Sequence, residues 1–391
     1  MLWEYIDSLS NASDIILKTF LALFLWETDA NLYPILVFGV AYFAAIPIAS
    51  LIGGALSNSV APKIAMLSGI WMQVTQIILI ILLANSLDTF LLIFIGIIGG
   101  LGKGFKNVAI RDIADQTRPH DNEAKYYAGK SIQYQLLNLF IPLACALIIG
   151  TGTSGYLVVF EIAIFILIAE SFLTSLVQVQ NLSTTFRLKE ILTIPGTNPS
   201  KLTLIKGIFL EGLSEGVTLT IVPIITLVFV GSIINWGILN TALVLISILA
   251  GIVIGQIIDD INSKSLYAVG ALIYASTCLF FISRYNFYIL AIFLVARTLM
   301  FVIKNAGYYG SIDKIMSQDS NEAYLYSEYQ FLIDLVTSVA RLIPLVILIL
   351  LNINIKDETI IRSVLIILGL IPLFTLSMLG RTSVFNKATR A

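Results

Sequence analysis

The chain has 391 residues, of which 58% are hydrophobic and only 12% charged, and its mean hydropathy is +0.94. Soluble domains carry about twice that fraction of charged residues, so the composition excludes an ordinary soluble protein and indicates a polytopic helical membrane protein. The net charge of −1 gives no reason to expect a nucleic-acid partner, and Cys145 and Cys278 lie in apolar segments, which indicates packing rather than a disulfide.

Polar and turn-rich residues divide the chain into twelve apolar segments that can cross a bilayer as helices. The predicted fold class is therefore an all-α membrane protein with twelve transmembrane helices. The predicted spans are residues 3–26, 32–57, 64–85, 88–114, 125–150, 155–179, 203–230, 233–258, 264–283, 286–313, 325–351 and 360–380.

Five polar residues interrupt the first span, namely Glu4, Asp7, Asn11, Asp14 and Lys18. Their spacing places them on one stripe of a helix, and such a stripe should face protein or a water-filled cavity rather than lipid. The alternative is an interfacial amphipathic segment followed by a short first helix. We favour a single span.

Basic residues are concentrated in the loops that follow even-numbered helices and in the C-terminal tail, whereas the loops after odd-numbered helices hold only Arg284 and Lys356. The positive-inside rule then places both termini in the cytoplasm, in a multi-pass protein of the cytoplasmic membrane. The longest connection lies between the sixth and seventh helices. We therefore predict an N-terminal bundle of six helices over 1–180, a cytoplasmic linker over 181–202 and a C-terminal bundle over 203–391.

Four short matches relate the two halves at offsets between 198 and 202 residues. GALSNSVAPK (54–63) matches GQIIDDINSK (255–264), FKN (105–107) matches IKN (303–305), NEA recurs at 122–124 and 321–323, and FIPL (140–143) matches LIPL (342–345). Because the matches keep their order and nearly constant spacing, they indicate a duplicated unit of six helices.

Two six-helix halves, a long central connection and a G-x-x-x-D-type loop after the second and eighth helices resemble the major facilitator superfamily. The resemblance implies two pseudo-symmetric bundles and a cytoplasmic gate at these loops. Asn58 stands where the family usually has aspartate, so Asp259 should carry more of the gating charge. The implied gate residues are Asn58 and Lys63 in the first copy and Asp259 and Lys264 in the second.

The resemblance also implies that helices 1, 4, 7 and 10 line a central cavity, and these predicted helices hold most of the membrane-embedded charge. An isolated charge at the bilayer centre costs about 3 kcal/mol on insertion scales, which favours a functional role for such residues. Acids fall on helices 1 and 7, and bases fall on helices 4 and 10. The candidate substrate and proton site therefore comprises Asp14, Glu211, Glu215, Lys103, Lys106, Arg297 and Lys304.

Two roles fit these residues. Buried carboxylates, above all Glu211 and Glu215, can carry a proton across, and the cations can hold a substrate carboxylate or phosphate. Purely structural roles remain open: Asp14 and Lys18 can neutralise one another. Lys106 and Lys304 can pair with loop acids such as Asp115 or Asp313. Glu328, Asp334 and Arg341 can be struts between helices. No role is predicted for Glu161 and Glu170.

Glycine-rich stretches indicate close helix packing rather than phosphate binding, because none follows a strand. They are GGLGKG (99–104), GLSEG (212–216) and GIVIG (251–255). The single histidine, His120, cannot form a metal cluster alone. The sequence therefore predicts no metal site, no cofactor and no enzymatic activity.

The leading hypothesis is a secondary active transporter that moves a small organic solute by alternating access between the halves. Coupling to protons is favoured over sodium because acids are plentiful and unwound helix breaks are not evident. Export is favoured over uptake, and the protein is expected to act as a monomer in the bilayer. The alternatives are a lipid flippase, whose cations would grip a phosphate, and a non-transporting membrane partner, which would tolerate neutral substitutions at Glu211, Glu215 and Lys304.

Overall fold

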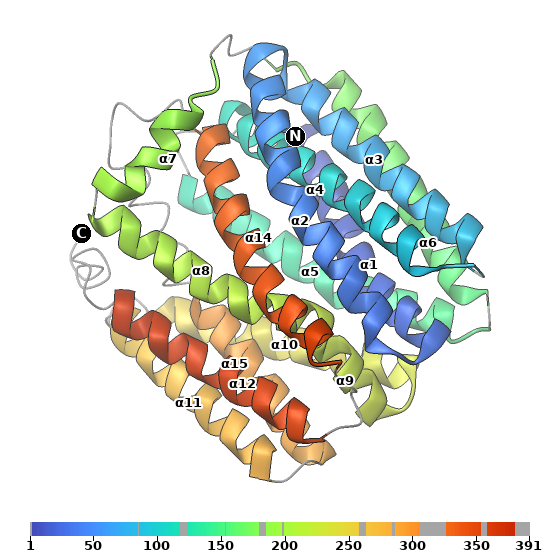
Figure 1. Cartoon of the computed structure of the whole chain (residues 1–391), viewed down its shortest axis with the longest axis vertical. Coiled ribbons are helices and arrows are strands. Elements are labelled where there is room, and N and C mark those ends of the chain that lie inside the picture. The colour runs from blue at the N-terminus through green and yellow to red at the C-terminus, as the bar shows by residue number, and fades with distance from the viewer. Residues whose placement is uncertain are drawn as a thin grey trace.

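The computed structural model describes residues 2–84, 86–117, 123–152, 154–179, 185–197, 199–257, 263–283, 286–304, 326–352 and 358–379. Within these ranges every regular element is an α-helix, and the long helices run side by side in one bundle (Figure 1). Nine of the described helical segments are long and apolar enough to cross a membrane, and three shorter apolar helices accompany them. The predicted all-α membrane fold is confirmed.

The first six predicted spans correspond to six helices. These are α1 (Leu2–Asp29), α2 (Leu32–Ser59), α3 (Pro62–Leu83), α4 (Thr89–Thr117), α5 (Glu123–Ile149) and α6 (Gly155–Leu176). The polar start of the chain belongs to one uninterrupted helix, α1, rather than to a separate interfacial segment. Within its polar stripe, Asp7 faces protein, because it is buried and pairs with Lys130 of α5 at 3.1 Å.

The rest of the chain also follows the prediction, with two additional helices, α7 and α9. The remaining helices are α7 (Leu188–Thr197), α8 (Pro199–Thr220), α9 (Val222–Val230), α10 (Ile233–Ile257), α11 (Ser263–Ser283), α12 (Phe287–Lys304), α14 (Tyr326–Leu350) and α15 (Glu358–Leu379). The short helix α7 lies in the central connection, where no helix was predicted. The predicted tenth span is described as far as Lys304, and residues 305–313 lie outside the described part.

The predicted seventh span is divided into α8 and α9 at Ile221. Pro223 has no N–H with which to continue the helical hydrogen bonds, so it favours a bend here. The bonds on either side remain, since the Ile221 N–H donates to the Val217 carbonyl at 2.8 Å and the Ile225 N–H donates to the Ile221 carbonyl at 2.9 Å. The span is therefore bent rather than unwound.

Small residues let α2 and α4 approach closely. Gly96, Gly100 and Gly104 recur every four residues on α4, and each faces the backbone of α2. A Cβ added at Gly100 would lie 2.1 Å from the Tyr42 carbonyl oxygen, and one at Gly104 would lie 2.3 Å from the Ile46 carbonyl oxygen. The close packing predicted for GGLGKG is confirmed.

Glycines also let α8 approach α14 closely. A Cβ at Gly212 would lie 2.6 Å from Ala340, and one at Gly216 would lie 2.6 Å from the Arg341 carbonyl oxygen. The prediction for GLSEG is therefore confirmed, whereas that for GIVIG is wrong at Gly251, whose added Cβ would have its nearest neighbour 3.9 Å away.

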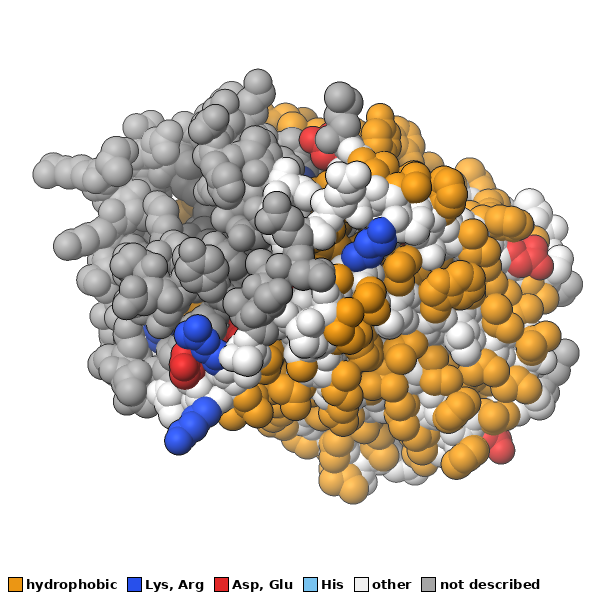
Figure 2. Space-filling view, turned by 90° about the horizontal axis from the view of Figure 1, so that it is seen from above, with side chains coloured by type: hydrophobic (Ala, Val, Ile, Leu, Met, Phe, Trp, Pro, Cys, Tyr) orange, Lys and Arg blue, Asp and Glu red, His pale blue; other side chains and the backbone are white. Residues whose placement is uncertain are grey.

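Helices α1–α6 form one group, and α8–α12 with α14 and α15 form a second group (Figure 1). The groups meet chiefly where α14, which packs on α8, contacts α2, and where α10 contacts α5. The face shown in Figure 2 carries mostly apolar side chains over its described helices, with few charges between them. Such a surface suits the hydrocarbon core of a bilayer, and the charged side chains of the spans must therefore be accommodated inside.

We predict that Gly100→Ala destabilises the protein by about 1–3 kcal/mol, because the added methyl group forces α2 and α4 apart. Thermal unfolding in detergent measures the effect. Gly251→Ala is the matched control and should unfold close to the unmodified temperature, since its methyl group meets no close neighbour. Equal unfolding temperatures for the two variants would contradict the close packing of α2 on α4.

Candidate functional site

A cavity of about 580 Å³ lies between the two groups of helices. Side chains of α1, α2, α3, α4, α8 and α14 line it, and α12 adds none among the described residues, although the resemblance implied that the tenth helix would. Among the described lining side chains, acids and bases are present in equal number. The ionisable carboxylates and cations are Asp14, Glu211, Glu215, Asp334, Lys18, Lys103, Arg111 and Arg341.

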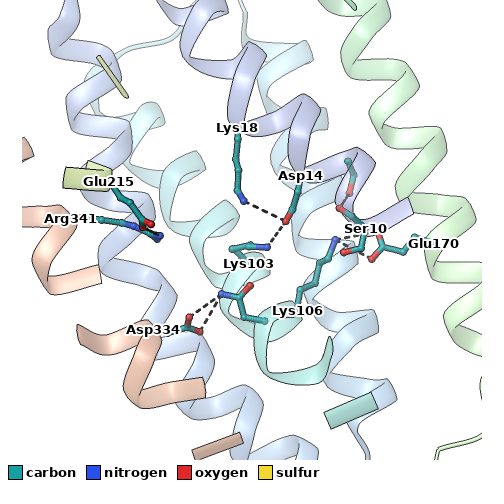
Figure 3. A network of polar contacts seen from close by, with 11 residues as sticks. Ser10, Asp14, Lys18, Lys103, Lys106, Glu170, Glu215, Asp334 and Arg341 are labelled. Carbon is teal, nitrogen blue, oxygen red and sulfur yellow. Dashed lines mark hydrogen bonds and ion pairs between the residues drawn. The ribbon is translucent and has the colours of Figure 1, made fainter. Parts of the chain in front are cut away.

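Asp14 of α1 is shared by two lysines (Figure 3). It forms an ion pair with Lys103 of α4, and its carboxylate lies 3.9 Å from the Lys18 Nζ. The Asp14 and Lys103 side chains are only 12% and 14% exposed, whereas the Lys18 side chain is 48% exposed. Lys103 is therefore the tighter partner, and the Lys18 ammonium keeps a face open to the cavity.

Glu215 and Glu211 of α8 each have a partner on a neighbouring helix. Glu215 accepts a hydrogen bond and ion pair from Arg341 of α14 at 2.6 Å, and the Arg341 guanidinium also lies 5.1 Å from the centre of the Phe43 ring on α2. Glu211 is 5% exposed and accepts a hydrogen bond from the Tyr267 hydroxyl of α11 at 3.1 Å. Arg341 thus links the carboxylate of α8 to an aromatic face across the cavity.

Asp334 of α14 joins the two groups of helices. Its carboxylate accepts hydrogen bonds from Ser50 of α2, from Asn107 of α4 at 3.1 Å and from Gln330 at 2.9 Å. The sequence left Asp334 and Arg341 open as struts, and the structure places both at the cavity. The spacing of Gln330, Asp334, Thr337 and Arg341 on one helical face was the signal that marks α14 as a lining helix.

Two predicted site residues lie away from the cavity. Lys106 of α4 forms an ion pair with Glu170 of α6 at 3.1 Å, and both side chains are fully buried beside Ser10 of α1 (Figure 3). Its partner is therefore neither of the loop acids considered from the sequence. Arg297 of α12 is half-buried and is absent from the lining residues, and the side chain of Lys304 lies outside the described part.

The two gate candidates of the first copy, Asn58 and Lys63, lie at the end of the bundle where α2 finishes, called here the Asn58 end. Asn58 donates a hydrogen bond to Glu328 of α14 at 3.2 Å, so it connects the two groups of helices. Lys63 donates to the backbone carbonyls of Ser175 and, at 3.4 Å, Val177, at the end of α6, and it therefore braces one group alone. The side chains of Asp259 and Lys264 lie outside the described residues.

No protein-family model matches the sequence, and no curated protein matches it significantly. The fold, in contrast, is shared with solved transporters over their full lengths. A D-xylose-proton symporter superposes with a TM-score of 0.74 at 12% identity, covering 100% of this chain and 98% of that one.

Two further structures match as well. A bacterial homologue of the iron transporter ferroportin, in an inward-facing state, has a TM-score of 0.69 at 12% identity and covers 97% of each chain. The nucleoside transporter NupG has a TM-score of 0.68 at 10% identity, covering 97% of this chain and 99% of that one. The chain therefore shares its fold with these three transporters, and it is the fold that the sequence resemblance implied.

Glu170→Gln should destabilise the protein by about 3–5 kcal/mol, because it leaves the buried Lys106 ammonium without its carboxylate. Glu161→Gln, on the exposed face of the same helix, is the control and should have little effect. Thermal unfolding in detergent compares them. Replacing both partners together, as Lys106→Met/Glu170→Met, should restore most of the loss, and a double variant as unstable as Glu170→Gln would contradict a purely structural ion pair.

Proposed function

We propose that the chain is a secondary active transporter that moves a small organic solute through the cavity by alternating access. In this proposal residues 1–180 and 203–391 form two bundles that rock about the cavity, and 181–202 connects them. The fold shared with three transporters supports the proposal, and so does a cavity whose charged lining comes from helices of both groups.

The Asn58 end is proposed to face the cytoplasm, with both termini on that side, in the cytoplasmic membrane. The support is the excess of lysine and arginine in the connections at that end, such as Lys63 after α2, Arg187 before α7 and Lys189 in the first turn of α7.

The proposed solute carries a carboxylate or phosphate group, either as an organic anion or as a zwitterion. Lys18 is the observation that carries this proposal: its ammonium lines the cavity, is nearly half exposed and makes only a 3.9 Å contact with Asp14, which Lys103 already neutralises. A cation so placed inside a membrane protein can gain a charge-assisted hydrogen bond from an incoming anion.

Proton coupling is proposed to use Glu215 with its partner Arg341, and Glu211 beside it. A proton on Glu215 would neutralise the carboxylate and free the Arg341 guanidinium, which can then bind the solute anion or change its contacts as the cavity changes sides. The pair lies only partly buried, with 28% of the Glu215 side chain exposed, so water in the cavity can deliver the proton.

A thermal-shift screen of amino acids, organic acids, sugar phosphates, nucleosides and neutral sugars tests the solute class. A ligand that binds only the native state at one hundred times its Kd stabilises by about 2.7 kcal/mol. We expect anionic or zwitterionic compounds to raise the unfolding temperature of the unmodified protein and to lose that effect in Lys18→Ala. Equal shifts in the unmodified protein and Lys18→Ala, or shifts with neutral sugars alone, would overturn the assignment.

Uptake and efflux of the solute identified in this way, measured in proteoliposomes under an imposed pH gradient, test coupling and direction. Glu215→Gln and Glu211→Gln/Glu215→Gln should lose the stimulation by the gradient, while Glu161→Gln should keep it. A double variant that transports with unchanged pH dependence would refute the coupling. Translocation of a labelled phospholipid without any transport of soluble solutes would instead favour a flippase.

A further inference from the structure

Two carboxylates are buried together at the Asn58 end, outside the cavity. Asp112 of α4 is 3% exposed and Glu328 of α14 is 1% exposed. Ser57 and Asn58 of α2 and Ser327 of α14 surround them, and these three side chains are also at most 2% exposed. Hydrogen bonds through these five residues join α2, α4 and α14.

Neither carboxylate has a cation within 4.0 Å among the residues that the structure describes. The charged neighbours are engaged elsewhere: Arg111 of α4 donates to Gln330 at 3.4 Å, Arg187 of the connection pairs with Glu190 at 3.5 Å, and Lys201 of α8 donates to Tyr329 at 2.8 Å. The last turn of α2 adds no ionisable side chain. Two neighbouring buried anions without a cation beside them are costly, and such groups usually become neutral instead.

If both carboxylates are ionised, Ser327 has one hydrogen for the two acceptors that it contacts. Ser327 Oγ lies 2.9 Å from Asn58 Oδ1 and 3.3 Å from Asp112 Oδ1, both acceptors, yet a hydroxyl has one hydrogen to donate. Ser57 donates to the other Asp112 oxygen, and Asn58 Nδ2 donates one of its two hydrogens to Glu328. Glu328 Oε2 has no hydrogen-bond partner among the residues that the structure describes. One donor is therefore missing at the contacts of Ser327.

We propose that Asp112 carries a proton when the Asn58 end is closed, and that this proton holds the end shut. A protonated Asp112 donates from Oδ1 to Ser327 Oγ, Ser327 donates to Asn58 Oδ1, and the Asn58 amide donates to Glu328 Oε1. Each of these hydrogen bonds then has its own hydrogen. One proton on Asp112 thereby links α4, α14 and α2 through successive hydrogen bonds.

Glu328 is the carboxylate that stays ionised. It lies in the first turn of α14, where the exposed N–H groups and the helix dipole favour an anion, and its Oε1 accepts the Arg187 N–H at 3.0 Å. Asp112 has no such help near the end of α4. Loss of its proton would place a second anion beside Glu328 and leave the Ser327 hydrogen shared between two acceptors, so the closed end should open as pH rises.

The inference does not require the proposed transport activity, because opening can be measured directly. Spin labels at Val60→Cys, at the end of α2, and Ser265→Cys, near the start of α11, report the separation of the two groups of helices at this end. Both positions are exposed, and the natural cysteines are buried. Pulsed electron paramagnetic resonance of the purified protein gives the closed and open populations as pH is varied.

We expect the ratio of closed to open molecules to fall by up to about tenfold per pH unit over the pH range in which the open form has released the Asp112 proton and the closed form still holds it, which is the slope for one proton. Asp112→Asn should stay closed at every pH, because its amide can donate to Ser327 as the protonated carboxyl does. Ser327→Ala should lower the closed population at every pH. Glu190→Gln, which alters only the exposed partner of Arg187, is the control and should titrate like the unmodified protein.

Three results would overturn the inference. If the distances between the two spin labels in the unmodified protein do not change with pH, no proton controls the closure of this end. Loss of the pH response in Glu328→Gln but not in Asp112→Asn would show that the proton is on Glu328 and not on Asp112. Closure that follows added Na⁺ or Ca²⁺ at fixed pH would identify a metal cation in its place.

Discussion

The cost of placing charge in a membrane is the constraint on which the rest of this structure depends. A charged side chain that faces lipid is expensive, so each ionisable group within the spans must meet a partner, water or both. The protein places most of these groups between helices. Asp14 meets Lys103, Glu215 meets Arg341 and Lys106 meets Glu170, and every one of these ion pairs connects two different helices.

The pairs differ in their access to the cavity, and this difference separates structure from function. Lys106 and Glu170 have no exposed surface, so they can fix α4 against α6 but cannot reach a solute. Asp14, Lys103, Glu215 and Arg341 line the cavity, and there a solute or a proton can compete for the same partners. The balance of charge in the cavity then lets ion pairs form and separate without leaving a net charge in the membrane.

The sequence predicted what is local and missed what is long-range. Apolar run lengths and four-residue spacings located the twelve spans and the packing of GGLGKG, because these patterns act within one helix or between neighbours. The partner of Lys106 lies 64 residues away, and the hydrogen bond from Ser50 to Asp334 spans 284 residues. No local pattern specifies such pairs. Arg297 was expected at the cavity because the resemblance placed its helix there, whereas the spacing that marks α14 as a lining helix was present in the sequence but was interpreted only as struts between helices.

The central claim is that a water-filled chamber between the two groups of helices shelters these charges. The reaction of a charged, water-soluble thiol reagent with single introduced cysteines tests it most directly, because thiols react as thiolates and these form only where water reaches. Leu219→Cys, which lines the cavity, should react, and Leu272→Cys, exposed on the outer face of α11, should not. An unreactive Leu219→Cys, or equal reactivity at the two positions, would contradict the account.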